Sequence, residues 1–302
     1  MTHPCGSYAR NDTIAWQALH TGQAPKMPTT PASQQLMNTL NPVHSPRSSL
    51  AVLGDVTFGL LMRELKTRFG NYRMGYAWAL IDPLIMLGVF CVIFGLRART
   101  SFGGVEAPVF IISGYLPFLL FNKVANQVKA AVSANMALFC YRQVTPFATM
   151  LTRYLLEVLI FLMVLIVISL ILIWFGFHPI PADFLPVFAA SFLLSLFAFA
   201  IGMLLCVINR YSPEVGKFFS YLMMPLMFLS GVMIPISVVP MPYQGWLLWN
   251  PILHAIELIR SGWIAGFSTP YASWSYLAGC TLIALVLAMS SYRLNRYRLI
   301  GS

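Results

Sequence analysis

Long runs of apolar residues alternate with short polar segments over most of this chain. About 20 apolar residues in a helix cross a hydrocarbon core of roughly 30 Å. By that measure the pattern predicts six membrane-spanning helices, at residues 77–97, 109–128, 151–175, 184–207, 218–236 and 274–292. The sequence therefore predicts an all-α integral membrane protein in which residues 76–302 form a six-span transmembrane domain.

Three segments depart from that pattern. Residues 1–48 are rich in Pro, Ser, Thr and Gln without apolar periodicity, and are predicted to form a flexible tail. Within residues 49–75, apolar residues at helical spacing are interrupted by charges, which predicts an amphipathic helix lying on the membrane surface. Residues 237–270 combine prolines and tryptophans with short apolar pieces, which predicts short re-entrant or interfacial helices before the last span.

The composition agrees with a membrane protein and adds an orientation. Hydrophobic residues make up 58% of the chain and charged residues only 9%, which argues against a water-soluble domain. The net charge is +10, but the basic residues lie in small groups between apolar runs, so a nucleic-acid partner is not expected. With the N-terminus inside, the inner segments carry 15 Lys and Arg and the outer segments 3. This asymmetry predicts that both termini are cytoplasmic.

No residue pattern indicates catalysis. The chain has no nucleotide-binding GxxxxGK[ST] motif, and its five cysteines lack metal-ligand spacing, so no catalytic residue, metal or cofactor is expected here. A membrane-embedded glycosyl- or acyltransferase is the alternative from another class. His254, Glu257 and Arg260 have the spacing of a polar helix face and lack a nucleophile. Arg153 and Glu157, four residues apart, are predicted to form an ion pair on a helix surface.

Polar residues within the second predicted span form a stripe. Tyr115, Asn122, Asn126 and Lys129 are seven, four and three residues apart, which places them along one side of a helix, with Lys123 beside them. Such a stripe either hydrogen-bonds to neighbouring helices or faces a wet path for cargo. The sequence leaves both interpretations open.

Three segments resemble one family of transporters. They are LLMRELKTRFGNYRMGYAWALIDP (60–83), YRQVTPFATMLTRYLLE (141–157) and SGVMIPISVVP…WNPILHAIELIR (230–260). Their order and content are similar to the polysaccharide-export permeases of ABC transporters (the type-2 exporter class), most of all to the KpsM-type subunits of capsular polysaccharide exporters. The resemblance covers about residues 50–298.

The resemblance implies a function and a set of partners. The chain would be the permease subunit of an ATP-driven exporter in the bacterial inner membrane, moving a lipid-linked acidic capsular polysaccharide. Two copies would assemble with two copies of a cytoplasmic ATP-binding subunit, which would hold ATP and Mg²⁺. A periplasmic polysaccharide copolymerase and an outer-membrane channel would continue the route. Related permeases for O-antigen, teichoic acid or a small hydrophobic compound remain open alternatives.

The resemblance also assigns candidate sites. The surface helix would contact the ATPase, and the loop at 129–148 would hold the coupling helix. The ATPase-coupling candidates are Arg63, Glu64, Arg68, Arg142 and Gln143. A sugar polymer needs hydrogen-bonding groups and flat aromatic faces along its path, and an anionic polymer is favoured by cations. The substrate-path candidates are Tyr72, Trp78, Tyr115, Asn122, Lys123, Asn126 and Lys129.

Overall fold

The computed structural model is helical throughout the residues that it describes. Those residues are 48–69, 75–95, 106–141, 143–233, 235–267 and 269–300. The chain divides after Ser48, and the helices below belong to the second unit, residues 49–302. The tail predicted at 1–48 lies outside the described residues apart from Ser48.

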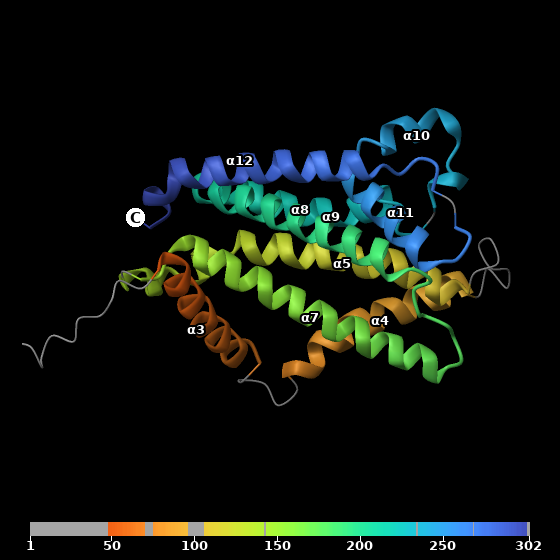
Figure 1. Cartoon of the computed structure of the whole chain (residues 1–302), viewed down its shortest axis with the longest axis horizontal. Coiled ribbons are helices and arrows are strands. Elements are labelled where there is room, and N and C mark those ends of the chain that lie inside the picture. Colours follow the sequence, from red (N-terminus) through yellow and green to blue (C-terminus); the bar gives the residue numbers. More distant parts are fainter. Residues whose placement is uncertain are drawn as a thin grey trace, which may run out of the picture. The chain divides into compact units, whose positions relative to one another are not determined.

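Ten α-helices and two short 3₁₀ helices make up the described part of this second unit (Figure 1). In chain order they are α3 (Ser49–Phe69), α4 (Gly75–Gly95), α5 (Ala107–Lys129), α6 (Ala131–Ala134), η1 (Met136–Cys140), α7 (Pro146–Trp174), α8 (Phe184–Tyr211), α9 (Pro213–Leu229), η2 (Ile236–Val238), α10 (Met241–Leu247), α11 (Pro251–Trp263) and α12 (Trp274–Ile300). The surface helix predicted at 49–75 corresponds to α3, which ends at Phe69.

Four described helices are long and apolar enough to cross a membrane. They lie within α5, α7, α8 and α12 and match the second, third, fourth and sixth predicted spans. Helices α4 and α9 occupy the places of the other two. The described side chains of α4 include a shorter apolar stretch, Ile81–Phe90. Helix α9 has 17 residues and ends before the position that the apolar pattern predicts, because the chain turns at Gly231, which adopts a φ of 71°.

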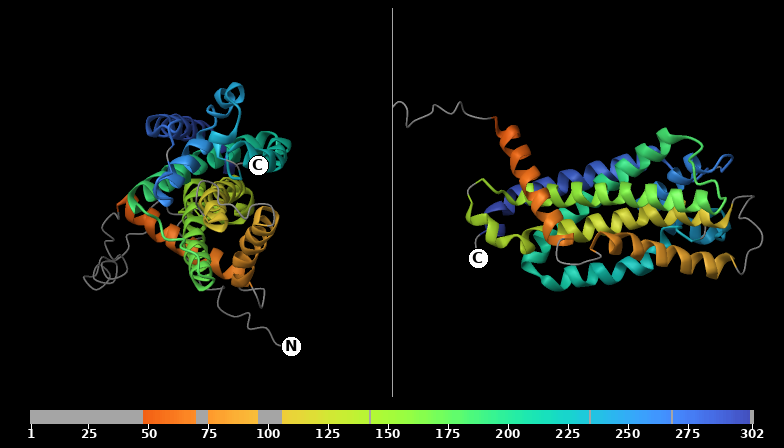
Figure 2. Two further views of the ribbon diagram at one scale, coloured as in Figure 1. Left: turned by 90° about the vertical axis from the view of Figure 1, so that its right-hand side faces the viewer. Right: turned by 90° about the horizontal axis from the view of Figure 1, so that it is seen from below.

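Helix α5 lies at the centre of the bundle. It packs against α4, α7, α8, α9 and α11. In Figure 2 it lies between α4 and α7 on one side and α8 and α11 on the other. The most apolar window of α5 is 78% buried, against 28% for α7 and 22% for α12. The outward faces of α7 and α12 are therefore available to lipid, while most of α5 is enclosed by protein.

A glycine permits the close contact between α5 and α8. A Cβ atom at Gly202 of α8 would lie 2.7 Å from Val128 Cβ and 3.1 Å from the Ala125 carbonyl oxygen of α5. Small residues at helix interfaces in membranes let two backbones approach in this way. The α5–α8 contact therefore depends on the absence of a side chain at this position.

Replacing Gly202 with alanine is expected to destabilise the fold by about 1–3 kcal/mol, because the added methyl group overpacks the α5–α8 contact. The measurement is the thermal midpoint of the detergent-solubilised protein. Gly279→Ala in α12 is the matched control, since a Cβ there meets no atom within 4 Å. Equal midpoints for the two variants would contradict the predicted role of Gly202.

Three helices contain an internal proline: Pro83 in α4, Pro117 in α5 and Pro225 in α9. A proline within a helix removes one backbone hydrogen bond and favours a bend. Helices α4 and α9 lie on the same side of the bundle and flank α5 (Figure 2). The interrupted helices thus form one side of the molecule.

The segment predicted to form re-entrant or interfacial helices contains η2, α10 and α11. Helix α10 is exposed around Tyr243 and Trp246, whereas α11 is buried on every side from Ile252 to Arg260. Asn250 caps α11 by accepting a hydrogen bond from the Ile252 N–H at 3.0 Å. Helix α11 packs against α5, α8 and α12. It is an internal element of the bundle.

Candidate functional site

A partly buried polar junction joins α3 to the bundle. The Glu64 carboxylate accepts hydrogen bonds from Arg153 Nε of α7 at 3.0 Å and from Asn135 Nδ2 at 3.2 Å. Arg63 Nη1 donates to Asn135 Oδ1 at 3.2 Å. Arg153 Nη1 also donates to the Gln127 carbonyl oxygen of α5 at 3.3 Å. We call these five residues (Arg63, Glu64, Gln127, Asn135 and Arg153) the α3 junction.

The ion pair at the α3 junction is shielded from solvent. The side chains of Glu64 and Arg153 are 12% and 14% exposed, so their attraction is screened less than that of a surface pair. The ion pair that the structure shows for Arg153 thus joins two helices, and it differs from the one with Glu157 that the sequence spacing predicts. The junction brings together two predicted coupling residues, Arg63 and Glu64. The side chain of Arg68 lies outside the described residues.

The predicted coupling loop forms two short helices. Helices α6 and η1 follow α5 directly, and α6 packs against both α5 and α7. Beyond η1, Tyr141 is 66% exposed and Gln143 is also exposed. Arg142 lies outside the described residues. The structure therefore places Tyr141 and Gln143 at the surface, close in sequence to the α3 junction residue Asn135.

Three of the predicted stripe residues lie together and reach α9. Lys129 Nζ donates hydrogen bonds of 2.8 Å each to Asn126 Oδ1, to the Gly216 carbonyl oxygen and to Ser220 Oγ. Asn126 Nδ2 donates to Asn122 Oδ1 at 2.6 Å. We call Asn122, Asn126 and Lys129 the α5 stripe. Each of the three side chains makes a hydrogen bond, and all three are only partly buried.

The remaining path candidates have different surroundings. Lys123 pairs with Asp82 of α4 at 3.2 Å, and both side chains are well exposed, at 47% and 62%. Tyr115 is buried and its ring meets the edge of Phe90 at a centroid distance of 5.5 Å. Tyr72 and the side chain of Trp78 lie outside the described residues. The α5 stripe and the Asp82–Lys123 pair therefore form the polar surface on the side of α4 and α9. Tyr115 lies in the core.

A second buried charge cluster lies on α11. Arg260 is fully buried and donates to the carbonyl oxygens of Gly231 at 2.6 Å and Val232 at 2.5 Å, just after α9. Its guanidinium lies over the Phe110 ring of α5, 4.1 Å from the centroid, and its Nη1 is 3.5 Å from Glu257 Oε1. We call Glu257 and Arg260 the outer lock, because they tie α11 to α5 and to the end of α9.

Burial and mutual attraction act in opposite directions on the two members of the outer lock. Burial raises the pKa of the Glu257 carboxyl, and the nearby Arg260 charge opposes that rise. Burial lowers the pKa of the Arg260 guanidinium to about 10, so it remains protonated at neutral pH. His254 Nδ1 accepts from the Ser273 N–H at 3.1 Å, which leaves the proton on Nε2 to bond the Leu248 carbonyl oxygen at 2.9 Å. All three polar side chains are therefore bonded to neighbouring segments of the chain.

Sequence reasoning did not identify Gln127, Asn135 or Ser220. Each is a polar residue in or beside an apolar helix, which is the one signal that could have indicated it. Their partners lie far away in sequence, as in the contact between Lys129 and Ser220. Among the residues that the structure describes, no group of three or more His, Cys, Asp or Glu side chains is placed to hold a metal ion.

Comparison with known proteins identifies the family. The model of the ABC-2 type transporter family matches residues 56–264. The chain belongs to this family. The ABC-2 match begins within α3 and ends just after α11, so it includes the α3 junction, the α5 stripe and the outer lock.

Three relatives of the ABC-2 chain have named roles. The polysialic acid transport protein KpsM of Escherichia coli is 34% identical over 85% of this chain and 99% of its own length. The capsule polysaccharide export inner-membrane protein BexB of Haemophilus influenzae is 29% identical over 80% of this chain and 92% of its own. The O-antigen export permease RfbA of Klebsiella pneumoniae is 23% identical over 83% and 95%.

Proposed function

We propose that this ABC-2 protein is the permease of an exporter that moves a lipid-linked acidic capsular polysaccharide across the bacterial inner membrane. The observation that carries the proposal is the 34% identity to a polysialic acid transport protein along nearly its whole length. Polysialic acid is a polymer with a carboxylate on each sugar. Lysines at positions 123 and 129, on the partly exposed polar side of α5, fit a cargo of that charge.

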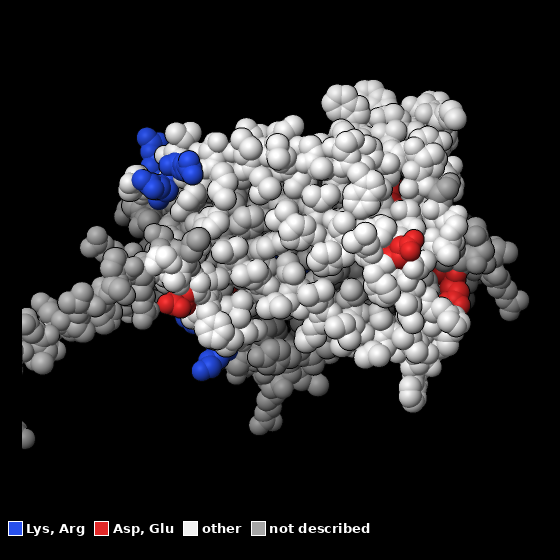
Figure 3. Space-filling view, in the orientation of Figure 1, with Lys and Arg blue, Asp and Glu red and all other residues white. Residues whose placement is uncertain are grey.

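The proposed topology has six spans with both termini in the cytoplasm. Helices α4 and α9 would be the two spans beyond the four long apolar helices. Basic side chains gather where α12 ends, and the broad band between the two ends of the visible face is mainly uncharged (Figure 3). Basic segments favour the cytoplasmic side of a membrane. The basic residues at the end of α12 therefore support a cytoplasmic C-terminus.

The proposed path runs between two copies of the chain, along the side formed by α4, α5 and α9. This side carries the α5 stripe and the Asp82–Lys123 pair. Helix α9 also exposes Phe218, Tyr221 and Phe228, which a second copy or lipid would cover. Amide and hydroxyl groups suit a sugar polymer because they exchange hydrogen bonds with its hydroxyls, and the lysines attract its carboxylates.

The proposed coupling surface is the region of α3, α6 and η1. A cytoplasmic ATP-binding subunit, in two copies, would dock here and supply ATP and Mg²⁺, with no cofactor held on this chain. Because α6 follows α5 after one residue, motion at α6 would reach the α5 stripe directly. The α3 junction would hold α3 in place against that motion. A periplasmic copolymerase would receive the polymer on the outer side.

The first test is co-purification of the full chain with its ATP-binding subunit, followed by ATPase assays and by export in a strain that lacks its own capsule permease. A stable complex, altered ATP turnover and surface capsule are expected. The paired Arg142→Ala and Gln143→Ala substitutions should weaken ATPase retention. No association with a folded, active ATPase would reject the proposal, and export of O-antigen without capsule would favour the role for which RfbA is named.

Replacing Lys129 with methionine is expected to reduce export of an acidic polymer about tenfold, which corresponds to about 1.4 kcal/mol of lost attraction. Capsule at the cell surface is the readout, normalised to the amount of permease in the membrane. Lys129→Arg keeps the charge and should restore most of the export. Arg293→Gln removes a charge from the exposed surface of α12 and serves as the control. Unchanged export by Lys129→Met would remove Lys129 from the path.

A further inference from the structure

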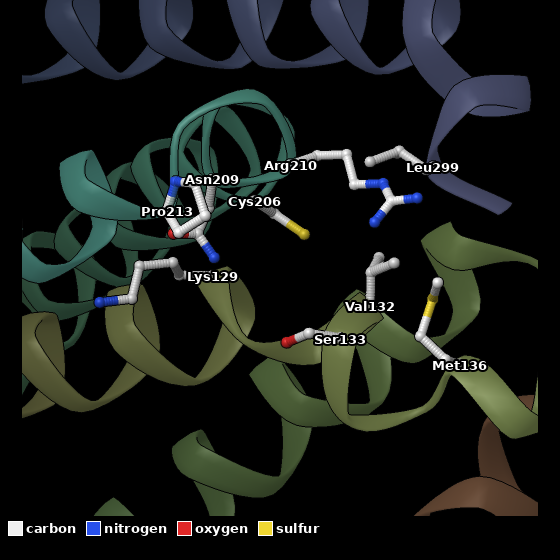
Figure 4. Close-up of a pocket in the computed structure, with 9 residues that line it drawn as sticks. All are labelled: Lys129, Val132, Ser133, Met136, Cys206, Asn209, Arg210, Pro213 and Leu299. Carbon is white, nitrogen blue, oxygen red and sulfur yellow. The ribbon is translucent and has the colours of Figure 1, made fainter. Parts of the chain in front are cut away.

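A cavity of about 280 Å³ lies where α5, α8 and α12 end (Figure 4). Its walls come from the ends of α5 and α8, from α6 and η1, from the first residue of α9, and from Leu299 near the end of α12. Ligand-binding cavities for small molecules occupy roughly 300–1,000 Å³. This cavity can therefore admit a small headgroup but not a sugar polymer.

The cavity carries positive charge on one wall. Arg210 extends across it toward Leu299 in Figure 4, and no ion pair joins Arg210 to an acid among the residues that the structure describes. Glu214, one turn further along, is exposed. Lys129 lends its alkyl stem to the wall, while its ammonium is bonded to α9. Arg210 is thus the group available to bind an anion.

The start of α9 adds to this positive field. Helix α9 begins at Pro213 on the cavity wall, and its N-cap residue, Ser212, makes no side-chain capping bond. The first N–H groups of a helix and its dipole favour an anion at this position. The Asn209 amide oxygen lies over Gly216 of α9, where a Cβ would clash with it, so the turn between α8 and α9 is tightly closed.

Apolar side chains also line the cavity. Val132 and Met136 lie across from Arg210 in Figure 4, and Leu299 lies where the Arg210 side chain ends. The apolar window of α12 is only 22% buried, so this helix borders lipid along its apolar stretch, and Leu299 lies in the basic segment that follows. A soluble anion would leave these apolar side chains unused, whereas a molecule with a phosphate at one end and hydrocarbon at the other would contact both them and Arg210.

We propose that this cavity binds the phosphate-bearing headgroup of an anionic phospholipid, with Arg210 as the principal contact. The placement in the cytoplasmic leaflet rests on the orientation given under the proposed function. Basic pockets between spans on the cytoplasmic side are suited to anionic headgroups. The lipid would brace the α8–α9 turn beside the contacts that Lys129 makes with α9.

The test uses the full-length chain purified in detergent, with phosphatidylglycerol as the probe. Bound lipid is counted by native mass spectrometry, and the thermal midpoint is followed as lipid is added. The wild type should retain phosphatidylglycerol and gain stability, and phosphatidylcholine should do neither. Arg210→Gln should bind at least tenfold more weakly, and Arg210→Lys should retain part of the binding. Arg293→Gln is the matched control, because six residues before Leu299 it lies on another face of α12.

Two results would overturn the proposal. Equal lipid binding by Arg210→Gln and Arg293→Gln would show only general attraction to a basic surface. Stabilisation by glycerol 3-phosphate as strong as that by phosphatidylglycerol would indicate a soluble phosphate ligand. The assay needs neither the ATPase nor export. Absent lipid binding with normal ATPase association would therefore reject this site alone. Normal lipid binding without ATPase association would reject the proposed function alone.

Discussion

Substitution of Arg260 by methionine is expected to lower the free energy of unfolding by about 3–5 kcal/mol, because it leaves the Glu257 carboxylate buried without its partner. Arg260 is completely enclosed and also bonds the Gly231 and Val232 carbonyl oxygens. The thermal midpoint and the yield of monodisperse protein in detergent measure the loss. Arg293→Met is the control, since Arg293 is exposed.

A second substitution and the pH dependence separate charge from packing. Adding Glu257→Gln to Arg260→Met removes the unpaired charge, so the double variant should be more stable than Arg260→Met alone. In the single variant the pKa of Glu257 is raised by burial without opposition from Arg260. Its defect should therefore shrink as the pH falls and the carboxyl becomes protonated. A defect that is independent of pH and of Glu257 would contradict the outer lock.

Substitution of Glu64 by glutamine is expected to reduce export about tenfold or more while the permease still reaches the membrane. A hydrogen bond to a charged group contributes about 1.5–3 kcal/mol, and each 1.4 kcal/mol is tenfold in an equilibrium. Loss of the ion pair with Arg153 would therefore shift the equilibrium between docked and undocked α3 about tenfold or more toward the undocked state. The measurement is capsule export per permease, together with ATP turnover of the assembled complex.

The charge swap tests whether Glu64 acts through Arg153. Glu64→Arg combined with Arg153→Glu should recover part of the export that either single substitution loses. Lys66→Gln, on the exposed side of α3, should leave export near the wild-type level. No recovery in the swapped variant, with both single variants folded, would place the importance of Glu64 elsewhere than in the α3 junction.

The sequence predicted four long spans well because bilayer thickness sets the length of their apolar runs. Helices α7 and α12 extend beyond the predicted ends for a local reason. Thr145 caps α7 by accepting from the Ala148 N–H at 3.2 Å, ahead of the apolar run. Helix α12 continues through its basic end to Ile300. A helix can thus continue beyond the hydrocarbon core, where its residues are polar and an apolar run no longer predicts it.

The candidate site was predictable only within single helices. The spacing of Asn122, Asn126 and Lys129 identified their common stripe because residues on one helix face recur at known intervals. The contact of Lys129 with Ser220, and of Glu64 with Arg153, joins segments about 90 residues apart. No periodicity encodes such a pairing, because it depends on how the helices pack. The spacing of Arg260 with His254 and Glu257 predicts a polar helix face, but it does not predict that packing buries all three side chains.

The internal prolines divide the bundle into a compliant half and a stiff half. Pro83, Pro117 and Pro225 interrupt α4, α5 and α9, which form the polar side, whereas α7, α8 and α12 carry no proline in their interiors. In α5 the proline separates the end that Arg260 contacts at Phe110 from the end that carries the α5 stripe. Bending energy is lowest at such points. A polymer of uneven width could therefore be accommodated by flexing one wall while the lipid-facing wall keeps its shape.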